Sequence, residues 1–366
     1  MSEDYPLPQR DELEISIFGP GYGECVLIHY GDGKWINIDS CINPQSKEPQ
    51  SLEYLKKMKL DPSKCLKLIL CSHWHDDHVR GLDKLYECSK DAKVVFSSCL
   101  SSKEFLTLLK AYSTNTMMAS TGLNVLNNII QINKEREDNK IVFASAGKLL
   151  LKDSVKGEPE NLEIEFWALS PSDHSVKNSY TSFSNLIPKA NLPKRHVNTF
   201  SPNDTSIVVQ LTINDESYLL GADLEESGNV SIGWSAVLNS DIRPSKKSSV
   251  FKVPHHGSQT AHLESVWTDM LHENPIALLT PFNRSKLLPS DDDVKRISSY
   301  SQNIYISAEH TRVKKQKYDK VIEKMLKDNI LSRRLVIPEF GQVQIRKKMN
   351  SREDFKVRLF GSAKKI

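Results

Sequence analysis

The segment Cys71-Ser72-His73-Trp74-His75-Asp76-Asp77-His78 carries the clearest structural signal in this chain. The apolar run Leu66–Cys71 leads directly into it and has the composition of a strand buried on both faces. On extended backbone, side chains two residues apart point the same way, so we expect His73 and His75 to aim at one point. The carboxylate and histidine that close the segment fall at the turn into a helix and face a second point nearby. This set of ligands suits divalent metals such as zinc.

Three other predicted strands also end in residues of metal-binding type. Asp39, Asp223 and the pair His255-His256 each follow an apolar run. Sites built on sheets usually lie where strands emerge from the core. Two divalent ions placed there would share a water and hold it as hydroxide against phosphorus or a carbonyl carbon. The chain has no Gly-x-Ser-x-Gly elbow, phosphate-binding loop or dinucleotide fingerprint, and this chemistry requires no serine or cysteine nucleophile.

Together these motifs resemble those of the metallo-β-lactamase-fold hydrolase superfamily. The superfamily signature His-x-His-x-Asp-His and its later ligands are matched by His73, His75, Asp77, His78, Asp39, Asp223 and His255. The resemblance implies an α/β fold, a four-layer αββα sandwich with two divalent ions, zinc or manganese, at one edge of the sheets. It implies one ion on His73 and His75, a second on Asp77, His78 and His255, and Asp223 between them.

Within that superfamily the chain is most similar to the ComEC-type branch, the hydrolase domain of DNA-uptake channel proteins and its free-standing relatives. The segments that carry this likeness are Gly21–Cys25, Ala168–Pro171, Leu219–Glu225 and Lys252–Ser258. One ligand histidine found in many superfamily members has no counterpart here. Asp204, His196 and His174 are the candidates to replace it. Leu288 stands where the branch has a late histidine, although Asn283 matches the asparagine before it.

The resemblance also suggests roles for residues around the ions. We expect Asp77 to orient the hydroxide, and His256 to act beside it as a second catalytic residue. Ser258 and Asn283 would contact the substrate. Asp39 would support the ligand loop by hydrogen bonding rather than bind metal.

The chain pattern predicts one hydrolase domain over residues 10–330, followed by basic strands or a tail over 331–366. Residues 100–160, with two predicted helices, are expected as a helical insertion over the site. The polar segment 171–204 is predicted to be a long surface loop, which is often functional.

The charge distribution adds a second functional clue. Residues 312–366 contain 17 Lys or Arg against 6 Asp or Glu, a net charge of +11. The basic residues expected to track a phosphate backbone are Arg312, Lys314, Lys315, Lys317, Arg333, Arg334, Arg346, Lys347 and Lys348. A solvated basic face explains such a run equally well. Our first hypothesis is a nuclease or other phosphodiesterase acting on DNA or RNA. The alternative is a hydrolase of a small ester, thioester, lactone or phosphocholine-like diester.

The N-terminus, the lack of long apolar segments and the cysteines indicate the cellular compartment that we expect for this protein. The acidic N-terminus has no apolar run behind a basic start, and no segment is apolar enough to span a bilayer. The six cysteines form no Cys-x-x-Cys pair and are expected to be reduced thiols. We therefore expect a cytoplasmic protein without a membrane partner, whose oligomeric state the sequence leaves open.

Overall fold

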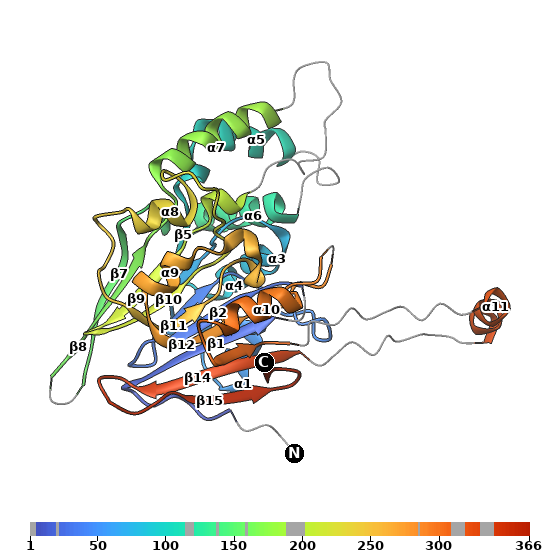
Figure 1. The fold of residues 1–366 in the computed structure, drawn as a ribbon. Helices are drawn as coiled ribbons and strands as arrows, with labels where there is room; N and C mark the ends of the chain where they lie inside the picture. Colours follow the sequence, from blue (N-terminus) through green and yellow to red (C-terminus); the bar gives the residue numbers. More distant parts are fainter. Residues whose placement is uncertain are drawn as a thin grey trace.

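Two eight-stranded sheets make up the frame of the part of the chain that the structure describes (Figure 1). The structure is a computed structural model that describes residues 5–19, 22–113, 121–136, 139–157, 160–187, 202–284, 286–308, 319–329 and 340–366. The first sheet has the strand order β15-β14-β1-β2-β3-β4-β5-β6 and the second β16-β13-β12-β11-β10-β9-β8-β7. Each sheet mixes parallel and antiparallel neighbours.

The strands of the first sheet are β1 (Glu12–Gly19), β2 (Cys25–His29), β3 (Trp35–Ile38), β4 (Leu66–Leu70), β5 (Lys93–Ser97), β6 (Ile141–Ala144), β14 (Gly341–Lys348) and β15 (Lys356–Phe360). Those of the second are β7 (Lys148–Val155), β8 (Leu162–Ala168), β9 (Val209–Ile213), β10 (Glu216–Leu220), β11 (Ser248–Lys252), β12 (Leu271–Leu279), β13 (Asn303–Ile306) and β16 (Lys364–Lys365).

The described α-helices are α1 (Gln50–Lys57), α2 (Pro62–Cys65), α3 (Asp76–Val79), α4 (Leu82–Cys88), α5 (Lys103–Ser113), α6 (Thr121–Glu135), α7 (Asp173–Leu186), α8 (Gly233–Leu238), α9 (Glu264–Asp269), α10 (Asp291–Ser298) and α11 (Lys320–Asn329). Four short 3-10 helices are η1 (Ser98–Ser101), η2 (Pro202–Thr205), η3 (His255–Gly257) and η4 (Gln259–Ala261). Among the described residues, no helix combines the length and apolar composition needed to cross a bilayer.

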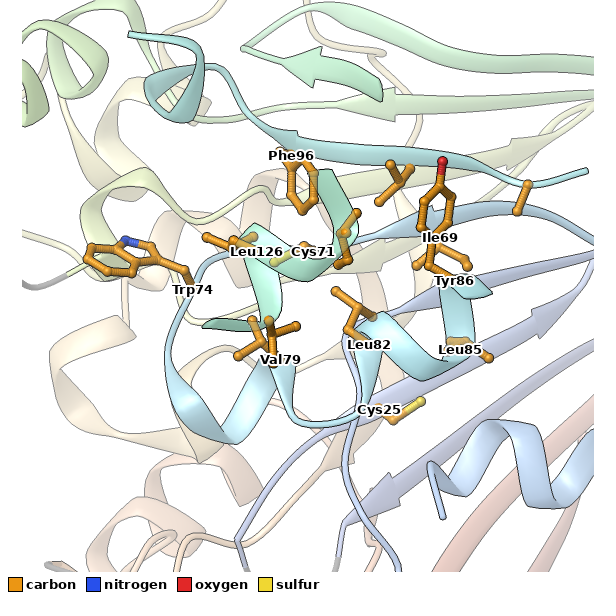
Figure 2. Packing of buried hydrophobic residues seen from close by; sticks show 14 of the residues in the cluster. Cys25, Ile69, Cys71, Trp74, Val79, Leu82, Leu85, Tyr86, Phe96 and Leu126 are labelled. Carbon is orange, nitrogen blue, oxygen red and sulfur yellow. The ribbon is translucent and has the colours of Figure 1, made fainter. Parts of the chain in front are cut away.

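Three apolar cores separate the layers. The central core joins alternate residues of the two sheets, such as Ile15 and Ile17 with Phe166 and Leu211. A second core lies between the first sheet and its helices, and Figure 2 shows part of it around Tyr86. A third fills the space between the second sheet and α8, α9 and α10. Helix, sheet, sheet and helix therefore follow one another, which confirms the predicted αββα sandwich.

The segment predicted as a surface loop over 171–204 contains α7, so that prediction was wrong for residues 173–186. Ser172 caps the helix by accepting a hydrogen bond from the Ser175 amide. Val176 and Phe183 then lie one above the other on a buried face that packs in the outer core of the first sheet. The abundant serine and asparagine concealed this apolar stripe. Residues 188–201 lie outside the described part of the chain.

Residues 100–160, expected as a helical insertion, contain the helices α5 and α6 together with strands of both sheets. Strand β6 extends the first sheet beside β5, whereas β7 pairs with β8 in the second. This segment therefore connects the two sheets, and among its described residues α5 and α6 are the helices added on the outside. Helix α6 contacts α3, and the Gly122 amide donates a hydrogen bond to Asp76. The two helices thus support the segment 71–78, which we call the His-rich loop, from the outer side of the first sheet.

Of the C-terminal strands, β14 and β15 belong to the first sheet and β16 pairs with β13 in the second. β14 pairs with β1 along its full length. Arg346, expected to contact a phosphate backbone, is buried and forms an ion pair with Glu14 at 2.7 Å. Lys347 pairs with Glu216, and Lys348 lies 3.5 Å from Asp11. These three basic residues therefore have partners within the fold. Arg312, Lys314, Lys315, Lys317, Arg333 and Arg334 lie outside the described residues.

His29 on β2 makes stability depend on pH. Its Nδ1 donates to the Glu12 carbonyl at 2.7 Å and its Nε2 accepts from the Gly33 amide, so the ring is held neutral. Burial lowers its pKa from 6.5 to about 4. As the pH is lowered between these two values, the unfolded chain therefore takes up a proton that the folded chain does not bind. The free energy of unfolding decreases as the pH falls through that window. The loss amounts to about 3 kcal/mol by pH 4.

We expect His29→Gln to reduce the difference in unfolding free energy between pH 7 and pH 4 by about 2–3 kcal/mol. Urea unfolding at the two pH values measures it. His272→Gln, at an exposed position, is the matched control and should behave as the unaltered chain. Equal pH dependence of the two variants would contradict the assignment.

Candidate metal centre

The His-rich loop follows β4 and presents two histidines to one side. His73 Nε2 and His75 Nδ1 lie 3.1 Å apart, so two ring nitrogens share one point. Trp74 between them points away, packing its ring against Phe105 and Phe183 at 5.9 and 6.3 Å between centroids. Figure 2 shows Trp74 at the end of the apolar cluster on the outer face of the first sheet. The alternation expected of extended backbone is what separates ligand from core side chains here.

Helix α3 carries the next two residues of the motif. His78 is fully buried, with Nε2 at 3.3 Å from an Asp223 oxygen and 3.9 Å from an Asp77 oxygen. Burial alone would lower the pKa of His78, but Asp223, Asp39 and Asp77 outweigh it and raise that pKa well above its usual value. The site therefore concentrates negative charge that a cation would neutralise.

Asp39 supports this loop from below. Its carboxylate accepts hydrogen bonds from the Ser72 amide at 2.7 Å, the Ser72 hydroxyl at 2.6 Å and His78 Nδ1 at 2.8 Å. The last bond engages Nδ1 and turns Nε2 towards the site, which is the usual orientation of a ligand histidine. Asp39 itself adopts φ 57°, a left-handed conformation that aspartate tolerates better than most residues.

His256, rather than its neighbour His255, has its ring next to the carboxylates of Asp77 and Asp223. Its Nε2 lies 3.6 Å from Asp77 Oδ2 and 3.8 Å from Asp223 Oδ2, and its Nδ1 donates to the Thr280 carbonyl at 3.1 Å. His255, expected to be the ligand, instead pairs through Nδ1 with Glu225 at 2.7 Å and has a side chain 23% exposed. Both histidines have left-handed φ values, 47° and 55°, so consecutive rings diverge.

Two charged residues that sequence reasoning missed lie beneath the ligands. Glu24 and Lys252 are both buried, with Lys252 Nζ 2.5 Å from Glu24 and 3.9 Å from Asp223. Lys252 also donates to the Ala222 carbonyl at 2.9 Å. The available signal was a charged residue next to an apolar run. Glu24, in Gly-Glu-Cys, comes just before one predicted strand, and Lys252, in Phe-Lys-Val, lies near the end of another.

The candidates for an additional ligand fall in different places. His174 is exposed on α7, and His196 lies outside the described residues. Asp204 lies on η2 and is exposed as a residue. Partial burial of its carboxyl group and the nearby charge of Glu225 raise the pKa of that carboxyl group. Its neighbour Asn203, which we did not nominate, is buried, and its Oδ1 has no hydrogen-bond partner among the described residues.

Ser258 and Asn283, the two residues expected to contact the substrate, lie in different surroundings. Ser258 is buried, and its hydroxyl accepts from the Thr260 amide and caps η4. Asn283 is half-buried in the segment after β12, between Phe282 and Arg284.

The residues fit divalent cations. Within the described part of the chain, His78 Nε2, His256 Nε2 and Asp223 Oδ1 are buried without a hydrogen-bond partner, an arrangement that is costly unless something binds them. Possible ligand atoms within 4.8 Å of one another occur in His73, His78 and Asp223, and again in Asp77, His78 and His256. Imidazole and carboxylate are the ligands that zinc and manganese accept. The fold and this cluster together define a sandwich with a candidate metal centre at its edge.

No family model matches the chain, and no curated protein matches it. Among solved structures, it is similar to the metallo-beta-lactamase fold protein YhfI from Bacillus subtilis, with 12% identity and a TM-score of 0.39 over 81% of this chain and 95% of that one. It is similar to MEM-A1, a subclass B3 metallo-beta-lactamase from a soil metagenome library, with 16% identity and a TM-score of 0.29 over 65% and 71%. For the metallo-beta-lactamase SMB-1 the values are 15% and 0.30 over 75% and 81%.

Proposed function

We propose that the protein is a metal-dependent hydrolase that cleaves phosphodiesters, with DNA or RNA as the substrate class. The observation that carries the proposal is the group of buried, unpartnered ligand atoms on His78, His256 and Asp223 at the ends of strands from both sheets. A folded chain tolerates such atoms at a place where an ion binds them.

In this proposal, His73 and His75 would hold one cation, Asp77, His78 and His256 would hold the other, and Asp223 would serve both. The cations, when bound, supply the Lewis acidity that activates water and the scissile group. Burial would raise the pKa of Asp77, but His78 and His256 keep it below the usual range. Asp77 therefore remains a hydrogen-bond acceptor that orients the attacking water. Asp39 and Thr280 keep the rings of His78 and His256 in the tautomers that binding needs.

The substrate class is proposed from charge at the mouth of the site. Arg80 and Arg284 lie beside the ring of Tyr22, and the charges of both arginines and of Asp77 act on the Tyr22 hydroxyl. Cationic groups beside a metal centre favour an anionic substrate over a neutral ester.

Hydrolysis of a small ester, thioester or lactone is the second candidate, and one observation favours it. An apolar cavity of about 190 Å³ lies between the first sheet and α5 and α6, lined by residues such as Phe96, Leu126 and Phe143. A cavity of this size and composition accommodates a small apolar group. None of its described lining residues belongs to the ligand cluster, so we rank this candidate below the first.

Incubation with labelled single- and double-stranded DNA and RNA, with manganese or zinc, tests the proposal. We expect cleavage that chelation abolishes and that Asp77→Ala lowers at least about 100-fold, since even residues that only orient ligands cost 10–100-fold. Circular dichroism would check that the variant folds. Hydrolysis of a small ester with no cleavage of any phosphodiester would transfer the assignment to the second candidate. Full activity of Asp77→Ala would contradict the mechanism.

A further inference from the structure

Three residues from separate segments meet at the mouth of the metal centre and form what we call the Tyr22 cluster, namely Tyr22, Arg80 and Arg284. The guanidinium carbon of Arg284 lies 3.5 Å from the centre of the Tyr22 ring and that of Arg80 lies 5.0 Å from it. Tyr22 precedes β2, Arg80 ends α3 and Arg284 follows β12. Such a cation–π contact contributes roughly 0.5–2 kcal/mol of stabilisation and restrains each guanidinium group.

The cluster is rigidly tied to the ligands. The Glu24 amide donates to the Asp77 carbonyl at 2.9 Å, which fixes the chain next to Tyr22 against α3. The Tyr22 ring lies 5.8 Å from that of Phe282, which in turn lies 5.3 Å from the His256 ring. Burial, Asp77 and Asp76 raise the pKa of Tyr22 against the opposing effect of the two arginines. Tyr22 therefore lies within the electrostatic reach of Asp77, and both arginines lie against the Tyr22 ring.

The two arginines are incompletely paired. Arg80 has one carboxylate nearby, Asp76 at 3.9 Å, and its Nε is buried without a hydrogen-bond partner among the described residues. Arg284 is exposed and forms no ion pair within the part of the chain that the structure describes. A guanidinium stacked by its face keeps its N–H edge available, and that edge matches two oxygens of a phosphate.

We propose that the Tyr22 cluster is a phosphate-binding subsite that holds a nucleic-acid phosphate next to the one being cleaved. This inference rests on the proposed function and names the part of the substrate that the site recognises beyond the scissile bond. A substrate with a single phosphate would leave the cluster unused, whereas a strand of nucleotides would fill it. The cluster would thus distinguish polynucleotides from small diesters.

The test compares Arg80→Gln and Arg284→Gln with Arg352→Gln, which removes the same charge at an exposed position between β14 and β15. The first readout is binding of a short fluorescein-labelled DNA or RNA strand to metal-free protein. We expect each cluster variant to bind about tenfold more weakly and to show a shallower salt dependence, as expected when one charge-assisted contact is lost. Arg352→Gln should bind as the unaltered chain.

The second readout is steady-state cleavage by the metal-loaded protein. For the same strand, the cluster variants should raise KM about tenfold, while for bis(p-nitrophenyl) phosphate, whose single phosphate has no neighbour to bind at the cluster, KM should rise much less. The inference is overturned if the cluster variants match Arg352→Gln in binding, if they lower both activities equally, or if the unaltered protein binds no strand. A protein that binds the strand through the cluster but cleaves no diester would refute the proposed function alone.

Discussion

Replacement of His256 by alanine will remove one metal-binding position and lower kcat/KM for a phosphodiester by at least about 100-fold. The reason is geometric, because His256 Nε2 faces Asp77 and Asp223 at 3.6 and 3.8 Å and its Nδ1 is anchored on Thr280. His255→Ala should cost far less, since His255 is occupied by Glu225 at the rim. Elemental analysis of the two purified variants, together with initial rates, measures the difference.

The two adjacent histidines are matched controls for each other. Each variant removes one imidazole from the same turn, so a general effect on folding would appear in both. Loss of metal and activity from His255→Ala, with both retained in His256→Ala, would show that His255 is the ligand. The arrangement described here would then be wrong at this position.

Lys252→Met will destabilise the metal-free protein by about 3–5 kcal/mol, because it leaves the Glu24 carboxylate buried without its cation. Both side chains are about 1–2% exposed, and the ammonium lies 2.5 Å from the carboxylate. Removing both charges together, in Glu24→Gln/Lys252→Met, should recover a large part of the loss, since no uncompensated charge then remains. Urea unfolding in the presence of a chelator measures all three proteins.

Lys152→Met is the control for this prediction. It breaks a pair of similar length, 2.9 Å, between Lys152 and Glu165, but on the surface, where the Lys152 side chain is 58% exposed. Solvent screens such pairs, so little change is expected. The buried pair would have no special role if Lys252→Met unfolded at the same urea concentration as Lys152→Met.

Features set by local backbone geometry were predictable from the sequence. His73 and His75 share a direction, with Trp74 opposed, because side chains alternate along extended chain over a distance of two residues. The same periodicity identified the strands that end before Asp39 and Asp223, and hence the layered fold. Each of these inferences depends on residues close together in sequence, whose relation the chain itself constrains.

Contacts between distant segments were not predictable in this way. Arg346 was expected in solvent on a basic tail, yet β14 enters the first sheet beside β1 and places Arg346 against Glu14. Helix α7 was missed because its apolar face is evident only once α5 and η1 provide a surface to cover. In both cases the partner lies far along the chain.

The sequence by itself determined that imidazoles and carboxylates gather at the ends of apolar strands, since alternation and strand punctuation are local properties. The tertiary structure alone decided that His256 rather than His255 faces Asp223, because two successive left-handed residues direct neighbouring rings to different sides. It also decided that Lys252 neutralises Glu24 and that Arg80 and Arg284 meet on Tyr22. These pairings join residues that only the packing of two sheets brings together.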